Sequence, residues 1–167
     1  MEKTMAQGRF FWLAVGMVAG LCVAYFWPHE PAYALATDRG PKFALLTGPA
    51  GPPDMEGVFL LDFLTGNLQG HVLNSRVGTF TRSYYRNIAP DFNLGGKFEP
   101  QWAIVSGSGK LAAAAGTQWG ACLIYVAELT SGKVIAYGFP YTETQRKVEP
   151  GRFEMIDFFQ FREGVTP

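Results

Sequence analysis

Charged residues and histidines are scarce in this chain of 167 residues. Asp, Glu, Lys and Arg make up 17% of it, below the usual quarter, and the 14 basic residues balance the 14 acidic ones. Most nucleic-acid-binding proteins carry an excess of basic residues that attracts the phosphate backbone. This chain has no such excess, so we expect no nucleic-acid partner. Histidine occurs only at His29 and His71.

Cysteine is equally scarce, with only Cys22 and Cys122 in the chain. Cys22 lies in a long apolar segment and Cys122 begins a separate apolar stretch, so we predict no disulfide between them. Neither cysteine stands at a metal-ligand spacing from another Cys or His. The sequence therefore predicts no metal site and no cofactor.

Apolar residues, in contrast, make up 48% of the chain, and one run of them stands apart. The segment 10–27, FFWLAVGMVAGLCVAYFW, contains no charged residue and has aromatic residues at both ends. As a helix it would span about 27 Å, close to the roughly 30 Å hydrocarbon core of a bilayer. Aromatic ends are typical of helices that cross both interfaces. We predict a transmembrane helix over 10–27, after a cytoplasmic N-terminus over 1–9.

Basic residues indicate the orientation of this segment. Lys3 and Arg9 precede it, and no Lys or Arg follows until Arg39. The positive-inside rule then predicts a single span in the inner (cytoplasmic) membrane, with the N-terminus inside and the C-terminal domain outside. An alternative is a signal peptide, because an A-x-A cleavage pattern ends at Ala36, and the protein would then be secreted. Both alternatives place the following domain outside the cytoplasm.

After a linker over 28–41, the domain over 42–167 repeats one pattern. FALLTG at 43–48 corresponds to WAIVSG at 102–107, and VFLLDFLTGNL at 58–68 corresponds to IYVAELTSGKV at 124–134. GTFTRSYY at 78–85 corresponds in turn to GRFEMIDFF at 151–159. Two repeat units therefore extend over about 42–88 and 101–162, with loops of different length between the matching stretches.

Each matching stretch is typical of a β-strand, since it is short, rich in β-branched or aromatic residues and bounded by Gly, Pro, Asp or Ser. Gly66 and Gly132 stand where a tight hairpin requires positive φ. We predict an all-β domain of two related four-stranded antiparallel units. These units could pack as a sandwich or barrel, form two propeller-like blades in a ring with other copies, or add their edges to a partner's sheet.

The strings WPHEPAYALATDRG, LLDFLTGNL and IYVAELTSGKVIAYGFP together resemble an uncharacterised family of small bacterial membrane-anchored or secreted proteins. The resemblance covers most of the chain and implies a location and a fold, but no catalytic role. The strand–Asp–x–x–Thr–Gly–strand pattern is also similar to a β-propeller blade of the quinoprotein-like or lactonase-like kind. Two blades are too few to close a propeller, which needs about four to eight.

Acidic residues at equivalent positions of the two units, Asp62 and Glu128, could form an acid–base pair or bind a cation. We instead interpret them, with Gly66 and Gly132, as structural turn residues, because a catalytic pair needs two different environments. His71 lacks a nucleophile motif nearby. We therefore predict no catalytic residue and a protein that is not an enzyme.

Aromatic residues are the best functional candidates, because they dominate protein interfaces and also stack on sugars. We expect an interaction surface at Tyr84, Tyr85, Trp119 and Tyr141. The leading hypothesis is a membrane-anchored structural or interaction module that binds another envelope protein or further copies of itself. The alternative is a glycan-binding, lectin-like module.

Overall fold

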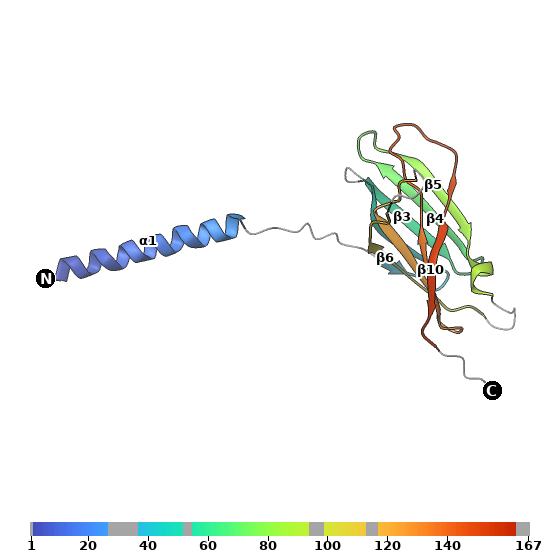
Figure 1. The fold of residues 1–167 in the computed structure, drawn as a ribbon, viewed down its shortest axis with the longest axis horizontal. Coiled ribbons are helices and arrows are strands. Elements are labelled where there is room, and N and C mark those ends of the chain that lie inside the picture. Colours follow the sequence, from blue (N-terminus) through green and yellow to red (C-terminus); the bar gives the residue numbers. More distant parts are fainter. Residues whose placement is uncertain (1, 27–36, 52–54, 94–98, 113–116, 163–167) are drawn as a thin grey trace. The chain divides into compact units, whose positions relative to one another are not determined.

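The computed structural model describes residues 2–26, 37–51, 55–93, 99–112 and 117–162 (Figure 1). The chain divides into two compact units, Met1–Ala32 and Tyr33–Pro167. The cleavage pattern at Ala36 and most of the predicted linker lie outside the described residues.

The first unit contains one helix, α1 (Glu2–Phe26), so the predicted spanning segment is helical up to Phe26. Its described apolar side chains are exposed, with Trp12 at 72% and Leu13 and Met17 at 67% each. Over the part of the chain with described side chains, no helix has both the length and the apolar character needed to cross a membrane.

The second unit consists of two β-sheets, which confirms the predicted all-β class (Figure 1). Neighbouring strands are antiparallel except for β5 and β9, which run parallel. A short 3-10 helix, η1 (Ala89–Phe92), follows β5. In spatial order, sheet A contains β1 (Thr37–Arg39), β2 (Phe43–Gly51), β3 (Met55–Asp62), β4 (Asn67–Asn74), β5 (Thr79–Asn87) and β9 (Gly151–Arg152). Sheet B contains β10 (Glu154–Gln160), β8 (Lys133–Gly138), β7 (Cys122–Glu128) and β6 (Trp102–Ser108).

The repeated stretches occupy matching places in the two sheets. Strands β2 to β5 form one meander, and β6, β7, β8 and β10 form the other. Phe43 lies opposite Asp62 in the first, and Trp102 lies opposite Glu128 in the second. The matching hairpin glycines both have positive φ, 68° in one turn and 74° in the other.

The edges of sheet A depart from the repeat. Strand β1 falls inside the segment predicted as a linker and pairs with β2. The stretch GRFEMIDFF, expected to form one strand, is divided between the sheets: Gly151 and Arg152 pair with β5 in sheet A, and Glu154 begins β10 in sheet B. Phe153 between them is fully buried, so the chain crosses the core at this residue.

The two sheets share one hydrophobic core, as the layers of a β-sandwich do. Buried and more exposed residues alternate along β3, β4 and β7, so each strand has one inner and one outer face. Phe59 and Tyr84 from sheet A contact Phe139 and Phe153 with ring centroids 5.0–6.2 Å apart. Gly70 leaves room for this cluster, because a Cβ there would lie 2.7 Å from the ring of Phe153.

Candidate interaction surface

Two of the four predicted surface aromatics are core residues. Tyr84 is 1% exposed and Tyr141 is 5% exposed, so the assignment of these two to an exposed surface was wrong. The hydroxyl of Tyr84 donates to the carbonyl of Pro140 at 2.7 Å, and burial raises the pKa of Tyr84 to about 12. The ring of Tyr141 packs directly on Gly51, where a side chain would clash with it.

The other two predicted aromatics reach solvent to different degrees. Tyr85 is 42% exposed and lies on the outer face of sheet A, opposite Gln69. Trp119 is half-buried, forms an isolated bridge with Pro140 and packs near Gly138. The four residues therefore do not form one surface, and of the four only Tyr85 exposes much of its ring to solvent.

The carboxylate of Asp62 lies in its own hairpin turn. It accepts the N–H of Leu64 at 2.9 Å and the hydroxyl of Thr65 at 2.8 Å. The hydrogen bond from the Thr65 hydroxyl, and to a smaller extent that from the Leu64 N–H, holds the pKa of Asp62 below its ordinary value. The same turn is closed by the Gly66 N–H, which donates to the carbonyl of Asp62 at 2.9 Å.

The carboxylate of Glu128 lies in the equivalent turn of sheet B. It accepts N–H groups from Gln101, Thr130 and Ser131 at 3.1, 3.0 and 2.6 Å. Burial acts to raise the pKa of Glu128, but these bonds outweigh it and leave the pKa below its ordinary value. The Gly132 N–H donates to the carbonyl of Glu128 at 2.9 Å. Each acid is thus engaged locally, and the described contacts do not pair them.

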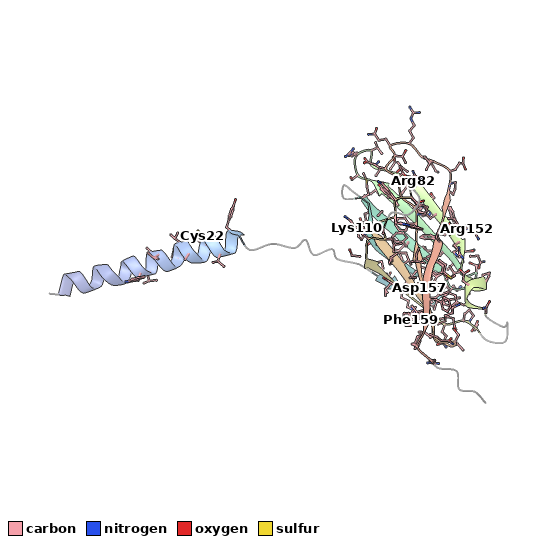
Figure 2. All side chains as sticks on the ribbon, in the orientation of Figure 1. Cys22, Arg82, Lys110, Arg152, Asp157 and Phe159 are labelled. Carbon is pink, nitrogen blue, oxygen red and sulfur yellow. The ribbon has the colours of Figure 1, made fainter. Side chains whose placement is uncertain are left out.

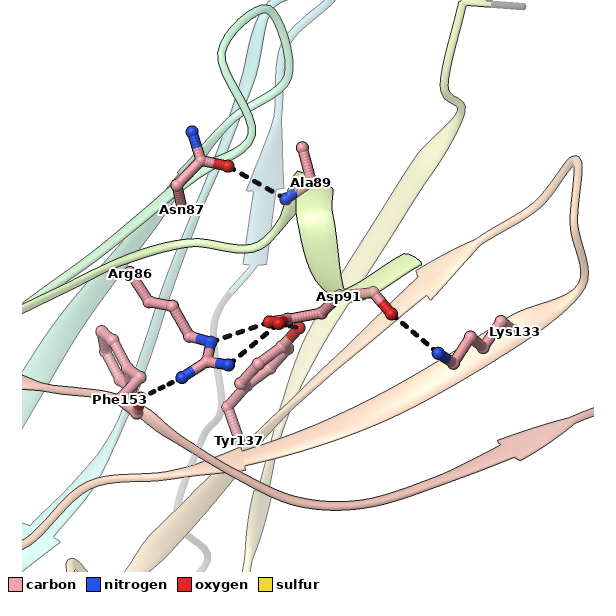
Figure 3. Close-up of polar contacts among 7 residues, drawn as sticks. All are labelled: Arg86, Asn87, Ala89, Asp91, Lys133, Tyr137 and Phe153. Atoms are coloured by element: carbon pink, nitrogen blue, oxygen red, sulfur yellow. Dashed lines mark hydrogen bonds and ion pairs between the residues drawn. The ribbon is translucent and has the colours of Figure 1, made fainter. Parts of the chain in front are cut away.

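An ion pair that the sequence analysis missed joins the two sheets (Figure 3). Arg86 on β5 donates to both carboxylate oxygens of Asp91 in η1, at 2.7 and 2.9 Å, and to the carbonyl of Phe153 at 3.0 Å. The hydroxyl of Tyr137 on β8 donates to the same carboxylate at 2.9 Å, and Lys133 donates to the carbonyl of Asp91 at 2.7 Å. Every described donor of this cluster has a protein partner, which indicates a structural role.

His71 lies on the outer face of sheet A beside a hydroxyl. Its Nδ1 is 3.2 Å from the Oγ of Ser83, and its ring makes edge contacts with Phe80 and Tyr85. Among the described residues, no carboxylate is hydrogen-bonded to this ring and no three His, Cys, Asp or Glu side chains gather as metal ligands. The pair thus lacks the third group that orients a catalytic histidine.

Strand β10 carries large exposed apolar side chains on both of its faces. Within the described chain β10 pairs with β8 alone, so its other side is open. Met155, Phe158, Phe159 and the following Phe161 are 45%, 53%, 59% and 49% exposed. We call these residues and the open side of the strand the β10 edge; Figure 2 labels Phe159 among them. An open edge with large apolar side chains is a template for pairing with another chain.

The outer face of sheet B is also apolar and adjoins the β10 edge. Val105 on β6 is 55% exposed, and partly exposed Tyr125 and Ala136 lie on the same cross-strand row. Phe159 continues the neighbouring row through Val134. The exposed apolar surface is thus continuous from the β10 edge onto the face of sheet B. A continuous apolar surface is typical of an interface, whereas scattered apolar residues are common on any protein surface.

A pocket of about 370 Å³ lies at the β5–β9 edge of sheet A. Gln69, Tyr85 and Arg152 form one cross-strand row there, and Asn67 and Asn87 form the next. The side-chain amide of Asn87 donates to the carbonyl of Thr65, and its oxygen accepts the N–H of Ala89. The pocket therefore combines an exposed ring, two amides and a guanidinium.

Comparisons with protein-family models, with curated proteins and with solved structures found no match for the chain. The resemblance to an uncharacterised family of small membrane-anchored or secreted proteins therefore stays a prediction.

Proposed function

We propose that this chain is a protein-interaction module whose β10 edge receives an extended strand from a protein partner. The single observation behind the proposal is the exposure of β10, on which the large apolar side chains are about half exposed beside backbone groups that no described strand pairs. Strand addition satisfies such backbone groups and buries the side chains in the same step.

The magnitudes favour a specific contact. Full burial of a phenylalanine contributes about 1.5–3 kcal/mol, so two half-exposed rings such as Phe158 and Phe159 offer on the order of 1 kcal/mol each. Backbone pairing adds roughly 0.5–1.5 kcal/mol for each hydrogen bond formed. The adjoining apolar face of sheet B enlarges the area that a partner can cover.

Photo-cross-linking tests this proposal on the full chain in its native membrane. A photoreactive residue at Phe158 is expected to give a discrete protein adduct, and mapping should place the cross-link in an extended segment. The matched control carries the same residue at Arg146, an exposed loop position outside the edge. Equal labelling from both positions, or no adduct from Phe158, would count against the proposal.

We also propose that α1 tethers the module to the inner membrane. This part rests on the uncharged segment 10–27, which extends beyond the described side chains, and on the helical backbone up to Phe26. The full chain should then stay in the membrane fraction after alkaline extraction. A mature N-terminus shortly after Ala36 would instead indicate the secreted alternative.

Glycan binding is a second candidate, supported by the pocket beside Tyr85. An exposed aromatic ring stacks on a sugar, and the amides of Asn67 and Gln69 suit hydroxyl groups. A glycan array probed with the full chain should give a signal that Tyr85→Ala abolishes. Phe80→Ala is the matched control, because Phe80 is 50% exposed and lies outside the pocket lining. An equal loss from both variants would argue against the pocket.

A further inference from the structure

The pocket at the β5–β9 edge contains a cation without a counter-charge. Arg152 on β9 is exposed and lies opposite Tyr85, and Figure 2 labels it. Within the described chain its guanidinium forms no ion pair and no hydrogen bond. The other guanidinium of the lining, that of Arg86, is engaged by Asp91 and by the carbonyl of Phe153. Arg152 is therefore the cation that is available to a ligand.

The described lining of the pocket contains no acidic side chain that would offset this charge. Asp62 lies opposite Asn67 on β3, but its carboxylate accepts hydrogen bonds within its own turn. Glu154 begins β10 in sheet B, beyond the point where the chain crosses the core. A pocket with a cation and no acid favours an anionic ligand. A guanidinium matches the two oxygens of a carboxylate, because its N–H groups form a planar fork.

The neutral groups of the pocket suit a sugar ring beside that anion. Tyr85 is 42% exposed and lies between Gln69 and Arg152 in one cross-strand row. The ring of His71 contacts the ring of Tyr85 by an edge, with centroids 5.9 Å apart, which limits the movement of the tyrosine. The side-chain amides of Asn67 and Gln69 have no hydrogen-bond partner among the described residues, so they are available to hydroxyl groups.

We infer that this pocket binds a uronic acid, a sugar whose carboxylate pairs with Arg152 while its ring stacks on Tyr85. This inference rests on the proposed glycan-binding function and names the ligand class. Neighbouring strands are about 4.8 Å apart, which is comparable with the width of a pyranose ring. A carboxylate on Arg152 therefore leaves the attached sugar ring over Tyr85, and the amides of the same edge face its hydroxyl groups.

The size of the pocket agrees with a small ligand. Its volume of about 370 Å³ lies near the lower end of the range of about 300–1,000 Å³ for ligand pockets. One acidic sugar residue of a longer glycan suits such a volume. A carboxylate that carries no sugar would use Arg152 but leave the exposed ring and the two amides without partners.

A glycan array probed with the full chain in detergent tests the ligand class. The array carries oligosaccharides of glucuronic or galacturonic acid, each beside its carboxyl-reduced counterpart, which keeps the stereochemistry and loses the charge. The uronic acids should bind at least about tenfold more tightly than their reduced counterparts, because a neutral hydroxyl replaces a hydrogen-bonded carboxylate.

Arg152→Gln should lower binding of the uronic acids to the level of their reduced counterparts. Arg146→Gln is the matched control, because Arg146 is also exposed, carries an equal charge and lies outside the pocket lining. Arg152→Lys should recover only part of the binding, since an ammonium group lacks the planar fork of a guanidinium. Urea denaturation separates a loss of binding from a loss of folding, and Arg152→Lys keeps the test decisive if Arg152→Gln is unstable.

The failure of this inference is distinguishable from that of the glycan-binding function. Equal binding of uronic acids and reduced counterparts, abolished by Tyr85→Ala, would keep the function and overturn the acidic ligand. No signal from any glycan would overturn both. Equal losses from Arg152→Gln and Arg146→Gln would show unspecific attraction by charge and overturn the site. Competition by acetate as strong as that by free glucuronate would indicate a site for any carboxylate, including a peptide C-terminus, and would overturn the sugar.

Discussion

Arg86 and Asp91 form a bidentate ion pair between two side chains that are each only 15% exposed. The pair lies where strand β5 of sheet A passes into η1, and Tyr137 of sheet B donates to the same carboxylate (Figure 3). Burial acts to raise the pKa of Asp91, but the bonds from Arg86 and Tyr137 outweigh it and keep the carboxyl ionised. The sheets are thus joined by a satisfied polar cluster as well as by aromatic packing.

Replacing Arg86 by Ala should lower the free energy of unfolding by about 2–4 kcal/mol, because it leaves a largely buried carboxylate without its cation. Urea denaturation followed by tryptophan fluorescence measures this change. The control is Arg76→Ala, which breaks a pair with Glu143 whose side chains are 53% and 35% exposed. That exposed pair should contribute about 1 kcal/mol or less. Equal losses from both variants would contradict the structural role of Arg86.

The pH dependence of stability should follow the carboxylates whose pKa is lowered in the fold, Asp62, Asp91 and Glu128. A group with a depressed folded pKa stabilises the protein above its unfolded value and loses that contribution as the pH falls through the folded value. Stability should therefore be full at neutral pH and decline below the ordinary values of 4.5 for Glu and 3.8 for Asp.

Glu128→Gln isolates one part of this dependence. The variant should be less stable at neutral pH, since an amide oxygen replaces two carboxylate acceptors, and its decline towards acid pH should be shallower. Urea denaturation between neutral pH and pH values below 4.5 compares it with Glu56→Gln, a change at an exposed strand position. An unchanged slope for Glu128→Gln would refute the assignment.

Local patterns predicted two antiparallel units, because each meander pairs strands that are close in sequence, but they predicted neither β1 nor the division of GRFEMIDFF between β9 and β10. Alternation along β5 places Tyr84 and Tyr85 on opposite faces, but it does not indicate which of them faces the core. That depends on a distant segment, because the Tyr84 hydroxyl donates to the carbonyl of Pro140, 56 residues away. Tyr141 lies after the end of a strand, where residues do not alternate regularly between faces. The neighbouring sequence therefore gave no indication that Tyr141 is buried.

The β10 edge and the ion pair depend on contacts between distant segments. The stretch EMIDFFQ carries apolar residues on both faces, which is compatible equally with a buried strand and with an exposed edge. Only the sheet order makes it an edge. Asp91 is five residues from Arg86 but 46 from Tyr137, and no spacing rule links such positions.

The hairpin glycines provide a test of the turn geometry. Gly132 and Gly78 have similar positive φ values of 74° and 65°, so alanine should strain both by about 1–2 kcal/mol. A Cβ at Gly132 would also lie 2.5 Å from the Cβ of Arg162, whereas nothing lies within 4 Å of one at Gly78. Gly132→Ala should therefore be the more destabilising of the two in urea denaturation. A smaller loss for Gly132→Ala would contradict this packing.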